Sequence, residues 1–276
     1  MIVAIVLLAA SLPAQGPQTA KADENLARMK AIASSYRFAL DGDRAGTLQV
    51  GAEPAFRMGK QAAYDMTDGA IFLWAGDGGR PEAASQIYQV KGQPGAGLRW
   101  VQEFVSLSTG TFTATREGKP GWAPRRPGVE FRGLPDAPPP GETPTVRSRQ
   151  MKALALDFKV SDDFKGRGFT ELRLLPTPLA HYGKAGSGVL DGWLLAFAQG
   201  TDIEAFLLIE AREAPGGPEW NYAFAPMTTF GLKGTVKGQP AWDAPRRRSG
   251  DPSRPFYYLV LEDPPAAGKT PEEAPR

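Results

Sequence analysis

Apolar and polar residues alternate in short runs along much of the chain, a pattern that predicts β-strands. In the second half such runs occupy residues 171–182, 193–200, 203–213, 220–230 and 231–242, and a last one occupies 256–263. Glycine, proline and Asp-Gly pairs interrupt the runs, which is typical of turns. Because the connections are short, the pattern favours an antiparallel meander. A weaker run at 129–136 is the counterpart of the last strand in the first half.

Two segments, 24–40 and 145–160, show helical periodicity instead. In the first, Leu26, Met29, Ile32 and Ala33 fall on one helix face. Each segment precedes a set of predicted strands. The sequence therefore predicts an α+β fold class, with two mostly antiparallel β units, each preceded by a short helix. We expect the core of the second unit to include Trp220, Phe224, Leu207, Leu208, Phe197, Leu194 and Leu195.

The two halves of the chain resemble each other in sequence. The segment 117–122, EGKPGW, returns as KGQPAW at 237–242, and the ungapped comparison of 100–122 with 220–242 gives seven identities in 23 positions. Chance would give about one or two. Three further blocks match in the same order, beginning at Met29 and Met151, at 54 and 178, and at 68 and 191. We interpret this as internal duplication with pseudo-twofold symmetry, like a dimer fused into one chain, and expect a monomer.

The composition along the chain divides it into five parts. We expect a signal peptide at 1–14, a first α+β unit at 22–130, a proline-rich linker at 131–145, a second α+β unit at 146–263 and a disordered tail at 264–276. The linker contains three consecutive prolines, which favour an extended conformation. The tail has almost nothing apolar to bury. Whether the two units share a sheet, form a sandwich or sit apart is left open by the sequence.

The N-terminal residues 2–12 are almost wholly apolar. A membrane span takes roughly 20 apolar residues, so this run is too short to be one. It is typical of the apolar part of a signal peptide, with cleavage near Ala14. The alternative is a buried N-terminal strand. We predict export to the periplasm or the exterior, and no membrane span in the mature chain.

Charge and composition restrict the function classes. The chain has 32 basic and 30 acidic residues, a net charge of +2, which does not indicate a nucleic-acid partner. It has no cysteine, hence no disulfide, and a single histidine, His181, which cannot build a multi-histidine metal site. No phosphate-binding loop, dinucleotide fingerprint or nucleophile elbow occurs. We therefore expect no cofactor and no metal.

Several segments resemble a known family. These are RQMKALA, ELRLLPTPL, DGWLLAFAQGTD and LLIEAR. Together they resemble an uncharacterised family of exported bacterial proteins of unknown function, and the resemblance covers most of the mature chain. It carries no activity, ligand or catalytic residue. It implies only that the protein is exported and globular.

Carboxylates repeat in both halves and suggest one kind of chemistry. Asp68 and Asp191 each precede a glycine, and Glu82 and Glu204 recur in the same way. Paired carboxylates are the machinery of glycoside hydrolysis. An Asp-Gly pair before an apolar strand is more typical of a turn. For the glutamates, a structural hydrogen bond that both halves share fits as well as a functional role. His181 fits a general base or a polar loop residue.

Tryptophan and arginine also repeat, and these are the candidate ligand-binding residues: Trp100, Trp122, Trp220, Trp242, Arg125 and Arg246. Indole rings stack against flat ligands, and arginines that follow them in the sequence, as the pairs 125–126 and 246–247 do, can bind an anion. The alternative is that the tryptophans cover the sheet or the contact between the units, and that the arginines are solvated.

These observations favour a non-catalytic exported binding or interaction protein of the cell envelope, with an unknown envelope or extracellular ligand or protein as its partner. The first alternative is a hydrolase that uses aspartate or glutamate, acting on glycans. It requires carboxylates with raised pKa in a cleft. The second is a carrier of an apolar ligand, which requires a dry cavity of ligand size. We lean towards a protein that is not an enzyme.

Overall fold

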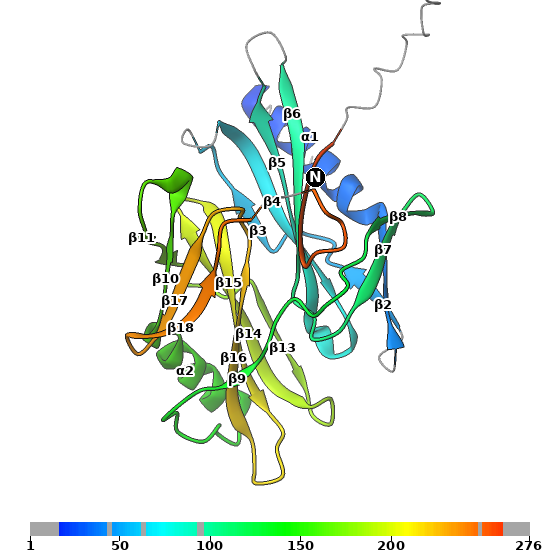
Figure 1. Ribbon diagram of the computed structural model, residues 1–276. Coiled ribbons are helices and arrows are strands. Elements are labelled where there is room, and N and C mark those ends of the chain that lie inside the picture. Colours follow the sequence, from blue (N-terminus) through cyan, green and yellow to red (C-terminus); the bar gives the residue numbers. More distant parts are fainter. Residues whose placement is uncertain (1–16, 43–45, 62–64, 93–96, 248–249, 262–276) are drawn as a thin grey trace, which may run out of the picture.

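The computed structural model describes residues 17–42, 46–61, 65–92, 97–247 and 250–261, with the side chains from residue 21 on. This part of the chain is mostly antiparallel β-structure, with two α-helices, α1 (Pro17–Ser34) and α2 (Pro144–Leu154) (Figure 1). The prediction of mostly antiparallel strands is confirmed, but the structure is richer in β-strands than the predicted α+β class. The predicted signal peptide and tail lie outside the described residues.

The strands of the first half belong to one curved sheet. They are β1 (Tyr36–Leu40), β2 (Gly46–Val50), β3 (Phe56–Met58), β4 (Met66–Ala75), β5 (Pro81–Lys91), β6 (Leu98–Ser106), β7 (Phe112–Arg116) and β8 (Lys119–Trp122). The order is β19-β6-β5-β4-β2-β1-β7-β8, with β3 on β4, and β19 is the late strand Phe256–Leu261. Although β6 and β8 lie near opposite ends of this order, the rings of Phe104 and Trp122 are only 5.1 Å apart. The sheet therefore curls around its own core, to which α1 contributes Met29.

The strands of the second half form two sheets with the same curl. The smaller has the order β11 (Thr170–Glu171), β10 (Phe158–Asp162), β17 (Leu232–Val236), β18 (Gln239–Ala244). The larger has the order β12 (Arg173–Leu174), β14 (Val189–Gln199), β15 (Asp202–Arg212), β16 (Glu219–Pro226), β9 (Arg132–Gly133), with β13 (Ala180–Lys184) on β14. Short 3₁₀ turns, η3 (Asp77–Gly79), η4 (Ala155–Asp157) and η5 (Phe164–Gly166), complete the elements. All seven predicted core residues are buried, which confirms that prediction.

The predicted helices at 24–40 and 145–160 extend too far. Their last residues are instead the strands β1 and β10. In β1, Tyr36 and Phe38 are buried while Arg37 is exposed, which is the two-residue alternation of a strand and not helical spacing. Pairing with β7 along all five residues of β1 overrides any helical tendency of this segment.

The hairpins that contain EGKPGW and KGQPAW have the same geometry. Glu117 and Gly118 have φ of 52° and 75°, and Lys237 and Gly238 have 49° and 76°. Two central residues with positive φ define the turn that matches the twist of a hairpin, and glycine takes the second position without strain. The two segments thus form the same hairpin turn. In each hairpin, the strand before the turn contains a β-bulge, at Ala114/Thr115 in the first and at Gly234/Thr235 in the second.

Two strands cross between the halves. β9 follows the first half in the sequence but pairs with β16, whereas β19 (Phe256–Leu261) follows the second half but pairs with β6. In Figure 1 the green segment before β9 and the orange-to-red segment before β19 run across the molecule in opposite directions. Thus β9, which follows the first half, completes the larger sheet of the second half, and β19, which follows the second half, completes the sheet of the first. The predicted linker at 131–145 contains β9.

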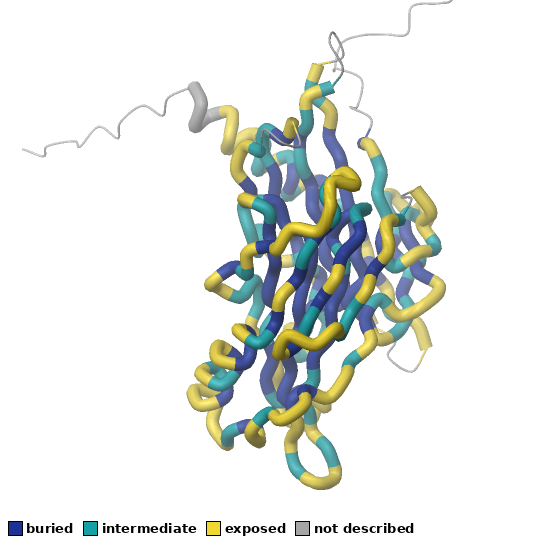
Figure 2. Tube along the Cα trace, turned by 60° about the vertical axis from the view of Figure 1, so that its left-hand side comes forward, coloured by how far each residue is buried: buried dark blue, intermediate teal, exposed yellow. Residues whose placement is uncertain are grey.

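A third core joins the halves. Apolar residues from the outer faces of β4, β5 and β6, such as Ile71 and Val105, pack with Leu194, Phe206 and Leu208 of β14 and β15. In Figure 2 the buried strands form a continuous dark-blue centre, with exposed loops around it. The two larger sheets therefore pack face to face, which answers the question that the sequence left open.

Candidate functional site

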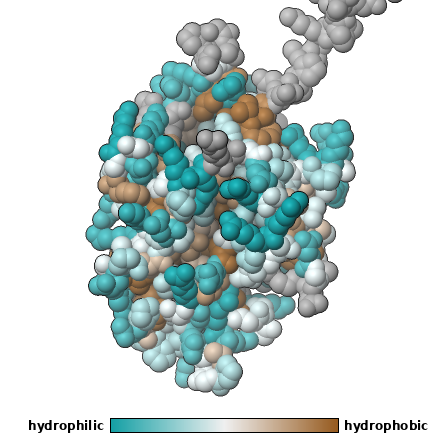
Figure 3. Space-filling view, in the orientation of Figure 1, coloured by the Kyte–Doolittle hydropathy of each residue, from teal (hydrophilic) through white to brown (hydrophobic). Residues whose placement is uncertain are grey.

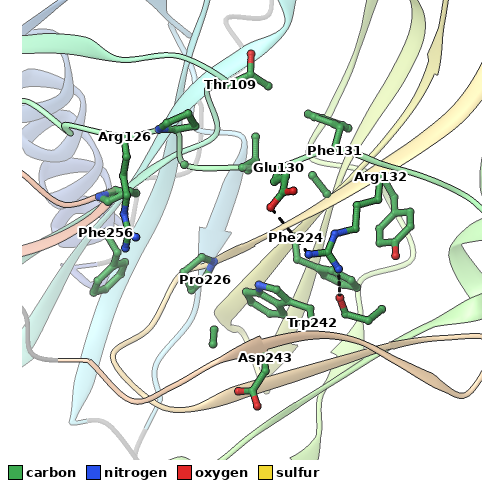
Figure 4. A pocket seen from close by; sticks show the side chains of 18 of the residues that line it. Thr109, Arg126, Glu130, Phe131, Arg132, Phe224, Pro226, Trp242, Asp243 and Phe256 are labelled. Carbon is green, nitrogen blue, oxygen red and sulfur yellow. Dashed lines mark hydrogen bonds and ion pairs between the residues drawn. The ribbon is translucent and has the colours of Figure 1, made fainter.

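A groove of about 820 Å³ lies at the place where the two crossing segments meet (Figure 4). We call it the arginine groove. Its walls come from the segment before β9, the end of β15, strands β16 and β18, and the segment before β19. The lining residues are Thr109, Arg126–Arg132, Arg212, Tyr222–Phe224, Pro226, Ala241–Pro245, Arg247 and Arg254–Phe256.

The groove exists because β9 pairs with β16 over only a short distance. The ladder consists of Gly133 with Asn221 and Arg132 with Tyr222. Towards Phe224 the two chains separate. In the first half the corresponding strands β19 and β6 pair over six residues without such a gap.

Contacts with the rest of the molecule hold the segment before β9 away from β16. The N–H groups of Gly128 and Val129 donate to the Ser108 carbonyl, at 2.9 and 3.3 Å. The Phe131 ring lies under the Arg212 guanidinium, whose Cζ is 3.8 Å from the ring centroid, and Arg80 lies 5.4 Å from the same ring. Such cation–π contacts stabilise the position of the ring. The opening is therefore built into the fold.

The groove is rich in positive charge. Five arginines line it, Arg126, Arg132, Arg212, Arg247 and Arg254, against two carboxylates, Glu130 and Asp243. Glu130 lies 3.9 Å from Arg132. Arg212 is already bound to the buried Glu210 at 2.7 Å. Its charge is thus neutralised inside the protein, and the excess lies at the other end of the groove.

At that end Arg126, Arg247 and Arg254 face one another. Burial, and then the charges of Arg126 and Arg254, lower the pKa of Arg247 to about 10. Nη1 of Arg247 is buried without a hydrogen-bond partner. Within the described residues, neither Arg126 nor Arg247 forms an ion pair. An anion placed here would supply the missing partner.

Aromatic rings line the groove beside the arginines. Trp242 stacks on Phe224 with the centroids 5.0 Å apart and the planes 9° from parallel. Phe256 lies 6.0 Å from the Arg247 guanidinium. Figure 4 shows Arg126 and Phe256 at one end, Arg132 and Glu130 at the other, and Trp242 between them. The arrangement can bind an anion and a flat or apolar group at the same time.

Three of the four candidate tryptophans lie in the cores. Trp100, Trp122 and Trp220 are 3%, 1% and 3% exposed and belong to the clusters inside the two halves. These three residues therefore fit the alternative in which the tryptophans cover the sheets. Trp242 is half-buried and lines the groove. Trp122 contributes indirectly, since its Nε1 donates to the Arg254 carbonyl at 2.8 Å and fixes the chain next to the groove.

Of the two candidate arginines, neither lines the groove. Arg125 is exposed, and Arg246 is exposed with its guanidinium 5.4 Å from the Phe230 ring. The second member of each basic pair, Arg126 and Arg247, is the one that reaches the groove. One member of each basic pair therefore lines the groove, but the sequence could not say which member that is.

A buried ionic cluster lies behind the groove. Glu210 is 0% exposed and accepts hydrogen bonds from Arg80 at 2.9 Å, Tyr182 at 2.9 Å and Arg212 at 2.7 Å. Arg80 also lies 3.1 Å from Glu82. A second cavity of about 380 Å³ is lined by residues that include Arg80, Glu82 and Tyr182. Because these charges neutralise one another, the cluster joins the two halves and offers no excess charge to a ligand.

Two carboxylates with raised pKa lie between the sheets. Burial, and then the charge of Asp202, raise the pKa of Glu103 to about 8, and burial raises the pKa of Asp202 to about 7. Tyr88 donates to Glu103 at 3.2 Å and Gln86 donates to Asp202 at 2.6 Å. Both carboxylates are less than a tenth exposed, and neither lines the two cavities described above. The hydrolase hypothesis requires them in a cleft.

Asp191 anchors a helix to the sheet. It lies inside β14, next to a β-bulge, so the prediction of a turn at this Asp-Gly pair is wrong. Its carboxylate binds Arg147 of α2 at 3.0 Å and Nε2 of His181 at 2.6 Å. Within the described residues no hydroxyl group forms a hydrogen bond with His181, and Asp191 holds the ring. This geometry is that of a structural contact.

Asp68 does the same in the first half. It lies inside β4, again beside a β-bulge, so the turn prediction is wrong here too. It accepts hydrogen bonds from Asn25 of α1 at 3.0 Å and from Arg57 at 3.1 and 2.7 Å. The matched Asp-Gly pairs therefore attach each helix to its sheet, and sequence reasoning missed this role because the partners are far away in the chain.

Other kinds of site are not found in the described residues. No group of three histidine, aspartate or glutamate side chains there can hold a metal ion. No helix there is long and apolar enough to cross a membrane. Comparison with protein-family models, curated proteins and solved structures gives no match.

Proposed function

We propose that the protein is a non-catalytic binding protein and that the arginine groove holds its ligand, an anion that carries a flat or apolar group. The observation that carries this proposal is the guanidinium of Arg247, which forms no ion pair in the described residues, has no hydrogen-bond partner at Nη1 and is repelled by Arg126 and Arg254. Like charges gathered at a half-buried place are unfavourable unless a counter-ion binds there. The aromatic walls at Trp242 and Phe256 provide for the uncharged part of the ligand.

The two alternatives have less support. The carboxylates with raised pKa, Glu103, Asp202 and Asp162, lie away from the groove, whose own carboxylates are outnumbered by arginines. A carrier of an apolar ligand needs a dry apolar cavity, and this groove is open and charged. The face of the molecule in Figure 3 is mainly hydrophilic, with separated apolar areas.

We further propose that the protein is exported and that its halves descend from one duplicated unit. The apolar start of the sequence supports export to the envelope. The matched hairpins, the matched bulges and the helix anchors at Asp68 and Asp191 support duplication. On this account the groove formed where one of two equivalent strand exchanges became incomplete.

Anilinonaphthalene sulfonate, an anionic aromatic dye whose fluorescence rises on binding, tests the proposal. Arg247→Gln and Arg126→Gln each remove one charge from the groove. The matched controls are Arg246→Gln and Arg125→Gln, which remove the neighbouring charge outside it. We expect the dye to bind, and each groove variant to weaken binding about tenfold, since one charge-assisted hydrogen bond is lost.

The control variants are expected to change the affinity by less than about twofold, because exposed charges away from a site contribute little. Thermal denaturation of all four variants establishes that each is folded. Equal affinities for the four variants, or no binding of the dye by the unmodified protein, would refute the proposal.

A further inference from the structure

We infer that the ligand of the arginine groove is an extended peptide segment with acidic side chains, which adds a strand to the open edge of β16. This inference rests on the proposed function and names the class of ligand. It is carried by two observations, an unpaired strand edge inside the groove and the arginines at its end.

Backbone geometry identifies the open edge. In an antiparallel ladder, alternate residues point their N–H and C=O groups at a given neighbour. The Leu134 N–H donates to the Trp220 carbonyl at 2.8 Å, so Trp220, Tyr222 and Phe224 are the residues of β16 that face β9. Tyr222 is paired with β9, but the described residues provide no backbone partner for Phe224 on this side. Its N–H and C=O groups are therefore available to another strand.

The first half shows what occupies such an edge. There Phe104, which corresponds to Phe224 in the sequence repeat, is paired with Tyr257 of β19. The edge of β6 is thus covered along its length by an extended segment. The same edge in the second half is covered only from Trp220 to Tyr222, by β9 and Leu134. An extended peptide at Phe224 would complete the ladder, as peptides do in strand addition.

The segment before β9 cannot close the gap without losing its own contacts. A Cβ atom on Gly128 would lie 1.9 Å from the Ser106 carbonyl oxygen, which shows how closely this backbone is packed against the first half. Phe131 is held by Arg212. The open edge is therefore a stable feature of the described fold, ready to accept a strand from outside.

Charge selects which peptide binds. Arg126, Arg247 and Arg254 lie at the end of the groove where β16 ends at Pro226. The charges of Arg126 and Arg254 act on Arg247, and Arg254 also pairs with Asp251 at 3.2 Å. In a peptide that runs parallel to β16, acidic side chains near the C-terminus or the terminal carboxylate would neutralise these arginines, while its backbone bonds with Phe224. Strand addition supplies affinity that is largely independent of sequence, and the arginines restrict it to acidic peptides.

The test uses isothermal titration calorimetry with the full chain and the acetylated octapeptide TVTFTVEE. One comparison peptide is TVTFTVQQ with an amidated end, which lacks the charges. Two others carry N-methyl groups on the odd or on the even residues, and each blocks one side of the strand. We expect TVTFTVEE to bind, and one of the two methylated peptides and the uncharged peptide to bind at least about tenfold more weakly.

Arg247→Gln and Arg126→Gln are expected to weaken binding of TVTFTVEE about tenfold relative to Arg246→Gln and Arg125→Gln. Hydrogen exchange of the Phe224 amide is expected to slow when the peptide is bound. If both methylated peptides bind as well as TVTFTVEE, or if only the dye binds, strand addition is overturned while the anion site stands. If neither dye nor peptide binds, the proposed function fails as well.

Discussion

At the scale of single residues, the arginine groove combines a cost in stability with a capacity to bind. Arg247 is partly buried, its pKa is lowered to about 10, and Arg126 and Arg254 repel it. A residue that is unfavourable in the folded protein alone but positioned in a groove is typical of a binding site. The basic pair was visible in the sequence. Its orientation depends on how the segments before β9 and β19 cross, which no local pattern encodes.

Arg247→Gln is expected to stabilise the unliganded protein while it weakens ligand binding. Because the pKa of Arg247 is lower in the folded than in the unfolded chain, its charged form costs stability at neutral pH. Solvent screening reduces the gain on removal to the order of 1 kcal/mol. Urea denaturation at neutral pH measures it, with Arg246→Gln as the control. A clear loss of stability in Arg247→Gln would indicate a structural role instead.

Glu103 is expected to make the protein less stable as the pH rises. The pKa of Glu103 is raised to about 8 in the folded chain, so the folded state retains a proton that the unfolded state has lost above its ordinary pKa of 4.5. Stability is therefore fully present below that pKa and is lost as the pH rises through about 8. A single group contributes up to roughly 1.4 kcal/mol per pH unit in this range.

Glu103→Gln is expected to flatten this dependence and to be more stable than the unmodified protein at the alkaline end. The charged group facing Glu103 is Asp202, whose pKa is raised to about 7, so a smaller slope remains in the variant. Denaturation curves at a series of pH values measure the effect. Parallel pH profiles for the two proteins would contradict the assignment.

At the scale of elements, the exchanged strands β9 and β19 decide how the chain is held together. β19 covers the whole edge of β6, while β9 covers only the end of β16. The sequence contained part of this, since a strong run at 256–263 and a weak run at 129–136 were both predicted strands. Which sheet each would join was not predictable, because pairing between distant strands depends on the packing of both halves.

Leu259→Pro is expected to destabilise the protein more than Val260→Pro. The Ser106 N–H donates to the Pro255 carbonyl, and the alternation that follows places the Leu259 N–H on β6 and the Val260 N–H away from it. Proline removes the donor, so the first change costs roughly 2 kcal/mol more than the second. Thermal denaturation compares the two variants. Equal losses would show that β19 does not act through its ladder.

At the scale of the whole molecule, the two halves are one folding unit. The third core lies between the larger sheets, the strands are exchanged, and the Glu210 cluster binds residues of both halves. The repeat in the sequence predicted two similar units and the alternation predicted their strands. The sequence could not predict that the outer faces of the larger sheets pack against each other. The sequences of β14 and β15 are almost continuously apolar, which indicates burial on both faces but does not identify the sheet that covers them.

Phe206→Ala is expected to destabilise both halves together. The side chain is fully buried in the third core, and its removal costs about 3–5 kcal/mol. Because the halves share this core, unfolding should remain a single transition at a lower denaturant concentration. Tryptophan fluorescence and far-UV circular dichroism should give coincident curves. Two separate transitions would show that the halves fold independently.

The position of a bound anion tests the central claim most directly. Diffraction from crystals of the protein grown with phenylphosphonate would locate both the charge and the ring. The account predicts the phosphonate within hydrogen-bonding distance of Arg247 Nη1, between Arg126 and Arg254, with the ring towards Phe256 and Trp242. A phosphonate bound elsewhere on the molecule, with the groove free of it, would contradict the account.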